Sequence, residues 1–508
     1  MRWFLGVDSN SGAARGLGSV RGGTRVVAVD RIVVREAIRR SSPDRPPQES
    51  SSGPNSPALR YRARAMASLS EILAQAQAEL AAGDARAAFS TIRPALDYPA
   101  ALLDGAAAMT AAFTGFAAVA RAIAGPDFAA LVQAVAADPD DPNALYEAGF
   151  ALYEQQLFGA AATVLARANR VVPQQRAILS ELAAALEGAM RYGDAALAVD
   201  ASGLAESDPL LAYLSGYNWI MVGEIDRAAA RLPLLARVDE TNLVHMRDAL
   251  GGMIRRAQAV RAAGIDLGEH ALTAWHAILN GALLTHESPF GYDEPMHGRY
   301  AFISDSPGLM HEGIDRLGRV LGALGLEPER VIRAPDRASS ILAGAVGRAF
   351  DRPVVDWGAE GQRGLVVAWS LEELDAPALL QAMFAHRPGQ ILFAHASNWV
   401  TPFGYAPDVT TLLGQTITHP FTGGALRVDP ATQQVAPAQP DLRDDAALAA
   451  EILAAEIDSP SQTPIDPVLA IARALAELPA GDRLGVGRTT GNRLRQRAGS
   501  PVHSARFL

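Results

Sequence analysis

Between about residues 70 and 262, apolar residues recur at intervals of three and four, and glycine or proline separates one segment from the next. This spacing places the apolar side chains on one face of each segment and predicts a succession of amphipathic α-helices. Ser68 followed by Glu71 fits a capping box at the start of the first helix.

The helical region contains an internal repeat. Alanine recurs at Ala161, Ala195 and Ala228, which are 34 and 33 residues apart, and Pro173 closes the first unit. The pattern resembles the tetratricopeptide repeat, in which small residues at the helix crossings let antiparallel helices approach closely. The resemblance implies a concave surface that binds a protein or peptide partner. A generic alanine-rich helical bundle is the alternative.

Versions of this repeat that bind peptide tails use a carboxylate clamp of lysine, arginine and asparagine. This sequence contains no lysine. A clamp here would need Asn143, Asn169, Asn218 and Arg191. The spacing of these residues does not establish one.

After about residue 268, short β-type runs alternate with helical ones. We expect strands at 299–304, 329–334, 353–357, 364–370 and 390–395, and helices at 307–324, 337–350 and 376–386. Such alternation predicts a mostly parallel sheet covered by helices. Loops are expected after residue 400, followed by helices near 443–457 and 465–478. The fold class expected for the chain is thus a helical solenoid followed by an α/β domain.

The expected domains are a disordered basic extension over 1–65, helical repeats over 66–265, the α/β domain over 266–480 and a disordered basic tail over 481–508. Residues 1–65 hold 12 arginines and 5 acidic residues, whereas residues 483–508 hold 6 arginines and no acidic residue. Such composition is typical of solvated tails. Because Met66 precedes the first helix, we interpret 1–65 as an over-extended reading frame.

Composition excludes several kinds of chemistry. The 508 residues contain no cysteine, which excludes disulfides and thiolate ligands. Because the sequence has no lysine, it has no Walker A motif and no lysine that could form a Schiff base. The arginine-rich, lysine-free composition is typical of a GC-rich bacterial genome.

Charge and hydropathy predict neither a nucleic-acid nor a membrane partner. The net charge is −10, and the region between the basic ends is more acidic still, which disfavours phosphate binding. The uncharged stretch 105–120 is shorter than the ~20 residues of a membrane span. It is interpreted as a buried helix pair. With no secretory signal, a cytoplasmic location is expected.

If the α/β domain binds a ligand, the site should lie beyond the carboxyl ends of its strands. Asp305, Asp336 and His395 follow three of these strands, and we expect His395 to act as general acid/base with the aspartates orienting or coordinating. The candidate ligand-binding residues are Arg299, Arg337, Ser339, Ser340 and Asn398. Helix capping by residues such as Asp336 is the alternative interpretation.

One segment of this domain resembles another family. RVIRAPDRASSILAGAVGRAFDRPVV (330–355) is faintly similar to the strand–helix–strand of phosphoribosyltransferases. The phosphate-binding loop of that family should follow, but the sequence there is VVAWSLEEL (366–374). The likeness therefore implies a related fold and not the family's diphosphate site.

The remaining histidines give two further expectations. In the loop 285–300, His286, Glu287 and His297 with two more acidic residues could hold a metal. Their spacing matches no zinc motif, so a solvated loop is favoured and neither a metal nor a cofactor is predicted. His276 lies on an apolar helix and is expected to be a satisfied buried histidine.

Two functions follow from these observations. The first is an interaction protein that recruits a protein partner through the repeats. The alternative is a transferase-like enzyme, in which the α/β domain acts on a phosphate- or carboxylate-bearing small molecule.

Overall fold

The structure is a computed structural model that describes residues 68–236, 238–268, 270–290, 296–358, 363–423, 426–428, 435–437, 439–457 and 460–504. The predicted extension over 1–65 lies outside these residues. The chain divides into two compact units. The helical unit runs to Trp219 and includes Ala230–Met246, and the α/β unit contains Ile220–Ala229 and the chain from Arg247 on. The expected boundary at 265 is therefore wrong, because most of the helix Thr241–Ala262 belongs to the α/β unit.

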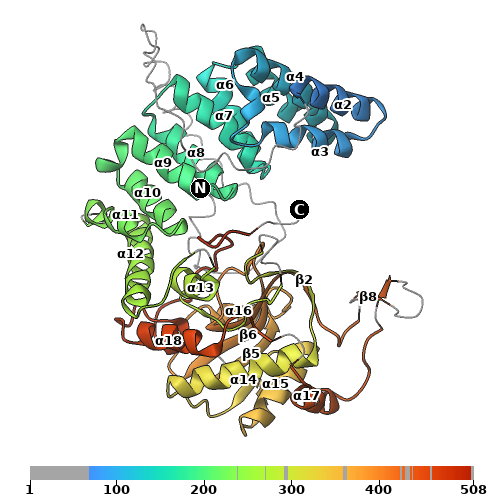
Figure 1. The fold of residues 1–508 in the computed structure, drawn as a ribbon, viewed down its shortest axis with the longest axis vertical. Helices are drawn as coiled ribbons and strands as arrows, with labels where there is room; N and C mark the ends of the chain where they lie inside the picture. The colour runs from blue at the N-terminus through green and yellow to red at the C-terminus, as the bar shows by residue number, and fades with distance from the viewer. Residues whose placement is uncertain are drawn as a thin grey trace, which may run out of the picture. The chain divides into compact units, whose positions relative to one another are not determined.

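The helical unit is a series of helices that lie side by side (Figure 1). They are α2 (Leu69–Ala81), α3 (Ala85–Leu96), α4 (Ala106–Ala124), α5 (Pro126–Ala137), α6 (Pro142–Glu154), α7 (Phe158–Val171), α8 (Arg176–Gly188), α9 (Tyr192–Ser202) and α10 (Pro209–Met221), with 3-10 turns at Ala101–Leu103, Leu204–Glu206 and Leu232–Leu235. The predicted capping box is confirmed, since Ser68 and Glu71 bond reciprocally at the start of α2.

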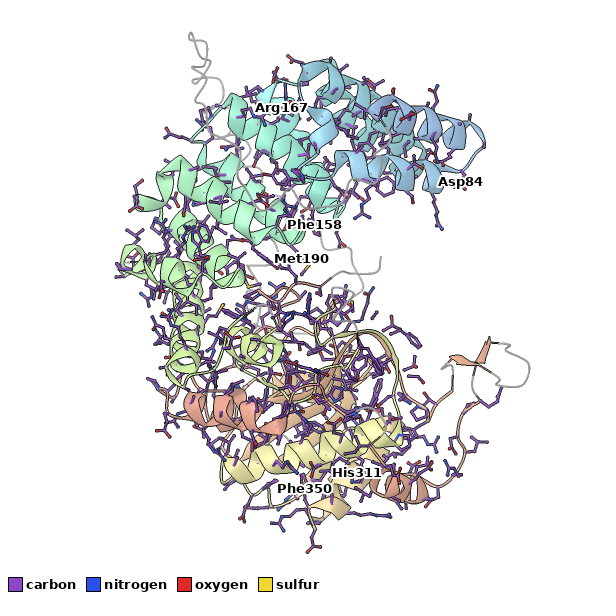
Figure 2. The ribbon with its side chains drawn as sticks, viewed as in Figure 1. Asp84, Phe158, Arg167, Met190, His311 and Phe350 are labelled. Atoms are coloured by element: carbon purple, nitrogen blue, oxygen red, sulfur yellow. The ribbon has the colours of Figure 1, made fainter. Side chains whose placement is uncertain are left out.

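The predicted repeat is confirmed by the packing of α6–α9. Gly149 of α6 lies against α7 so closely that a Cβ on it would come within 2.6 Å of the Leu165 side chain. Gly188 of α8 makes the same kind of approach to the ring of Phe158, which is labelled in Figure 2, because a Cβ there would lie 2.5 Å from it. These helix pairs are tetratricopeptide-like repeats, and glycine at the crossings is what permits their spacing.

The apolar stretch 105–120 forms part of one helix, α4, and not the helix pair expected. By length and composition alone, α4 could cross a membrane. Within the unit, its Phe113 and Phe116 are completely buried, and Phe116 packs edge-on against Phe128 of α5 at 6.4 Å. The helix is thus part of the core of the helical unit.

The α/β unit is built on a parallel sheet. Its helices are α11 (Ile225–Ala229), α12 (Thr241–Ala262), α13 (Leu272–Asn280), α14 (Pro307–Ala323), α15 (Arg337–Ala349), α16 (Pro377–Met383), α17 (Asp445–Ala454) and α18 (Ile465–Ala476). Its strands are β1 (Leu283–Leu284), β2 (Tyr300–Ser304), β3 (Val331–Arg333), β4 (Val354–Asp356), β5 (Gly364–Ser370), β6 (Gln390–Asn398) and β7 (Val409–Thr418). A separate antiparallel pair joins β8 (Leu426–Val428) and β9 (Val435–Pro437).

The strand order is β1-β7-β6-β5-β3-β4, with β2 also paired to β7, and all these pairings are parallel. The expected helix-covered parallel sheet is confirmed. Strand β7 was expected to be loop, yet it pairs with β6 inside the sheet. Every residue of β5 is buried, as is usual for a parallel strand covered on both faces.

The two faces of the sheet contact different helices. Val366 and Leu392 share one core with Met383 of α16. His395 lies three residues further along β6 than Leu392, and successive side chains of a strand alternate between faces. It therefore points to the opposite face, where it meets Gly313 of α14.

The C-terminal segment packs against the sheet. A bridge pairs Asn492 with Ala385, Val502 is 1% exposed, and Arg493 is buried against Asp408 at the amino end of β7. The prediction of a disordered tail over 481–508 is therefore wrong for the described residues up to Ser504. Arginines that looked solvated in the sequence bond to buried partners.

Candidate functional site

The predicted catalytic residues Asp305 and His395 lie in contact. Asp305 follows β2, His395 lies on β6, and their Oδ2 and Nε2 atoms are 3.2 Å apart. The indole of Trp369 on β5 donates to the same carboxylate at 2.7 Å, and the backbone N–H of Ser306 donates at 2.8 Å. Side chains of β5 and β6 thus contact the carboxylate that follows β2, in the carboxyl-terminal half of a parallel sheet.

An aspartate that accepts from the Nε2 of a neutral imidazole leaves the other ring nitrogen as an acceptor. In His395, this Nδ1 atom is buried and has no hydrogen-bond partner, and the same holds for Oγ1 of Thr411. Both atoms lie close to Gly313 of α14, where a Cβ would come within 2.8 Å of each. The side chains of Asp305 and His395 have no exposed area. The two side chains are therefore bonded to each other in a place that solvent does not reach, and the general acid/base role of His395 stays a prediction.

Asp336 and Ser339 lie near this pair, but their side chains form hydrogen bonds with the backbone of α15 and of β5. Asp336 caps α15 by accepting the N–H of Ser339 at 2.8 Å, as the capping alternative expects. The hydroxyl of Ser339 accepts the backbone N–H of Trp369 at 2.8 Å. The second carboxylate oxygen of Asp336 is buried without a partner. Ser340, half-buried, follows in the first turn, where its N–H donates to the Asp336 carbonyl.

His419, which follows β7, completes the surroundings of Trp369. Its ring meets the indole edge-on at 4.6 Å. Burial lowers the pKa of His419, while the negative charges of Asp305 and Asp336 oppose that shift. Neither Trp369 nor His419 was expected in this cluster. A tryptophan at the end of an apolar strand was the available signal.

The structure gives Arg337 a different role from the predicted one. Its guanidinium donates to the carboxylate of Asp445 at 2.9 Å and to the carbonyls of Phe421, Asp441 and Arg443. It therefore fastens the segment after β7 to the start of α15, and its donors do not face an anion site. This prediction failed because the distant residues 421–445 supply the acceptors.

Asn398 also has a structural role. Its side-chain oxygen accepts the N–H groups of Val400 and Thr401, each at 2.8 Å, and its amide donates to the Gln415 carbonyl. The side chain therefore shapes the turn after β6. This is the usual behaviour of asparagine at a strand end.

The residues that directly follow β1, from Thr285 to Ser288, are buried, contrary to the expected solvated loop, whereas Phe290 is 63% exposed. His286 is 1% exposed and lies between Glu312 of α14 and the Tyr300 hydroxyl, at 2.8 Å from each. Arg316 also pairs with Glu312, at 3.3 Å. In the described part of the chain, no three histidine or acidic side chains group as metal ligands. The acidic members of the loop at 293 and 294 lie outside the described residues.

Arg299, predicted to hold an anion, lies away from Arg337 in a pocket lined by α13, β7 and the C-terminal segment. Its guanidinium is 5.5 Å from the centre of the Trp399 ring. His276 lines the same pocket and is 5% exposed. Its Nδ1 contacts the Asn280 amide at 3.2 Å, while Nε2 has no hydrogen-bond partner. The expectation of a fully satisfied histidine is thus half correct.

The residues named for a carboxylate clamp do not assemble one. Asn218 donates to Glu187 at 2.7 Å and to the Leu214 carbonyl. Arg191 pairs with Asp194 and lies over the ring of Tyr98. Asn218 thus links α10 to α8, and Arg191 bonds to the first turn of α9.

Two solved structures are similar to the helical part of the chain. One is from work on the functional characterization of pilF from Pseudomonas aeruginosa; it is 20% identical with a TM-score of 0.23, and the match covers 38% of this chain and 86% of that one. The other is a tetratricopeptide repeat protein from Parabacteroides merdae, 19% identical with a TM-score of 0.20, covering 38% of this chain and 89% of its own. No protein-family model and no curated protein matches the sequence.

Proposed function

We propose that this protein is an interaction protein whose helical unit binds a basic, extended segment of a protein partner. The observation that carries the proposal is a row of half-buried acidic and aromatic side chains on the first helices of two successive repeats, made of Glu147, Phe150 and Tyr153 of α6 and Glu181 of α8. With the repeat spacing of 34 and 33 residues, Glu147 corresponds to Glu181 and to Leu214, so the acidic position is present in the first two of these helices. Equivalent positions of a solenoid fall on one side of it.

The row is distinct from the face that packs the repeats together. In α6, Leu145, Tyr146, Gly149 and Leu152 are buried, and Gly149 lies against α7. Phe150 and Tyr153 extend along another stripe of α6 and are half-buried. In α10, by contrast, the rings of Tyr213 and Tyr217 stack at 5.8 Å and are buried, so they belong to the packing face. We place this row on the concave side, where the curvature of a solenoid creates its binding surface.

The negative charge of the first helices of the repeats favours a basic partner. Together α6, α8 and α10 contain four glutamates and one arginine, and that arginine, Arg176, pairs with Asp208. Aromatic faces beside carboxylates suit arginine and lysine side chains, which gain both cation–π and ion-pair contacts. A carboxylate-ended peptide would be repelled. The proposed partner therefore carries several basic residues.

The test is fluorescence polarisation of the full chain with a labelled ten-residue peptide containing four arginines. Its match is the same peptide with glutamine in place of arginine. Replacing Glu147 and Glu181 by glutamine removes two ion pairs worth about 0.5–1 kcal/mol each, so Kd should rise roughly 5- to 30-fold. Asp104→Asn, at an exposed position outside these helices, is the control and should leave Kd unchanged. Equal binding of both peptides would refute the proposal.

A further inference from the structure

Two histidines from separate loops of the α/β unit lie in contact with each other. His270 precedes α13 and His297 lies in the loop before β2, and their Nδ1 atoms are 3.1 Å apart. This contact is exposed to solvent, whereas His276 and His286 are buried. An ion in solution can therefore reach the two facing ring nitrogens.

A tight turn fixes the position of His297. The N–H of Arg299 donates to the carbonyl of Met296 at 3.2 Å, and the two residues between them, His297 and Gly298, have φ angles of 44° and 85°. Two consecutive positive φ angles are typical of a type I′ turn, whose central positions favour glycine, asparagine and aspartate. Forming the turn therefore does not by itself account for a histidine at this position.

The same turn packs against the start of α13, beside His270. The carbonyl of Gly298 accepts the N–H of Ser288 at 2.8 Å, and a Cβ on Gly298 would lie 3.1 Å from the Leu272 side chain. The carbonyl of His270 in turn accepts the N–H of Leu272 at 2.9 Å. The backbone beside each histidine is thus held in place, so the fold brings the two rings together before any ligand binds.

The two imidazoles have the geometry of ligands that share one metal ion. Zinc binds a histidine nitrogen at about 2.0–2.1 Å, so an ion equidistant from two Nδ1 atoms that lie 3.1 Å apart would make an N–metal–N angle of about 100°. With the ion in both ring planes, that angle places the ring centres about 4.9 Å apart, and the observed separation is 5.0 Å. The angle lies between the roughly 90° of an octahedral site and the roughly 109° of a tetrahedral one. Both distances therefore fit one ion position.

We propose that His270 and His297 together bind one divalent transition-metal ion, for which Zn²⁺ is the probe, through their Nδ1 atoms. Without the ion, one neutral ring donates its Nδ1 proton to the Nδ1 atom of the other. When the ion binds, that proton moves to Nε2 of the same ring, and both Nδ1 lone pairs become metal ligands. Water completes the coordination, since the contact is exposed.

The ligand type sets the selectivity of this site. Imidazole suits zinc, copper and nickel, whereas magnesium and calcium require oxygen ligands. Of the loop residues considered in the sequence, the site uses only His297, because His286 and Glu287 are buried and bond to Glu312 and Thr273. The site is independent of the peptide surface proposed for the helical unit.

The experiment is a titration of the full chain, freed of metal and labelled with ¹⁵N at histidine, with ZnCl₂ and separately with MgCl₂. Binding is followed by calorimetry and by the ring ¹⁵N resonances. We expect Zn²⁺ to shift the Nδ1 signals of His270 and His297 together and to saturate both with one ion, whereas Mg²⁺ shifts neither. A shift of only one of the two rings, no shift with Zn²⁺, or an equal response to Mg²⁺ would overturn the proposal.

Variants test whether both rings are needed. His297→Asn removes one imidazole but keeps a residue that tolerates the left-handed conformation of the turn, so the loop should still form. His270→Gln removes the other ring at an exposed position. Each substitution leaves a single imidazole and should weaken Zn²⁺ binding at least about tenfold. His245→Gln, at an exposed position in the helical unit, is the control and should leave the affinity unchanged. Wild-type affinity in either ring variant, or an equal loss in the control, contradicts the assignment.

Discussion

A single methyl group on α14 tests the closeness of the helix to the buried Asp305–His395 pair. Gly313→Ala adds a Cβ that would lie 2.7 Å from Oγ1 of Thr411 and 2.8 Å from Nδ1 of His395. Both partners are on central strands and have little room to move. Overpacking of this kind costs about 1–3 kcal/mol. Exchanging glycine for alanine inside a helix returns about 1 kcal/mol. We therefore expect a net loss of up to about 2 kcal/mol in the free energy of unfolding.

Gly322 provides a matched control on the same helix. A Cβ at Gly322 meets nothing within 4 Å, so Gly322→Ala brings only the helix-propensity gain and should stabilise the protein. The two variants should differ by about 1–3 kcal/mol in urea unfolding followed by tryptophan fluorescence. Equal stabilisation by both substitutions would refute the argument, because α14 would then have space above His395.

Three further predictions concern buried charges. Burial and the charge of Arg299 lower the pKa of His276 to about 3, so its ring NMR signals should not titrate between pH 8 and 4. The unfolded chain, in contrast, takes up a proton at this histidine below about pH 6.5. The free energy of unfolding should therefore fall by up to about 1.4 kcal/mol per pH unit from pH 6.5 towards pH 3. Arg337→Gln removes the hydrogen bonds to three carbonyls and to Asp445, so the free energy of unfolding should fall by about 1–3 kcal/mol. Proteolysis between residues 421 and 445 should become faster. Arg493→Met leaves Asp408 buried without its partner at 2.6 Å and should lower stability by about 3–5 kcal/mol in thermal unfolding, whereas Arg319→Met on the exposed face of α14 should have little effect.

The elements most accurately predicted are those with a continuous local pattern. The run 364–370 is uniformly apolar and forms β5 with the expected bounds. Strand β7 was missed because two adjacent threonines interrupt its apolar residues and it follows a stretch rich in proline and glycine. It pairs with β6, the strand just before it, but also with β1 and β2, which lie far from it in the sequence. Such long-range pairing leaves no local signal.

The candidate site divides in the same way. The rule that ligands bind at the carboxyl ends of parallel strands correctly brought Asp305 and His395 together. The rule could not show that Gly313 of α14 lies directly against His395. Nor could it show that Arg337 donates to backbone carbonyls of residues 84 or more positions away. Nor could it show the hydrogen bond from the backbone of Arg497 to Asn280, because these residues are 217 positions apart.

That separation has a consequence for biosynthesis. The contact between Asn280 and Arg497 cannot form until the later residue has left the ribosome. At about 5–20 residues per second, translation of the intervening chain takes roughly 10–40 s. During this interval the nascent α/β unit lacks the segment that closes one end of its sheet, whereas the helical unit, whose contacts are mostly between neighbours in sequence, can already be folded. A ribosome-bound chain stalled before residue 482 should therefore recruit chaperones through its unfinished sheet.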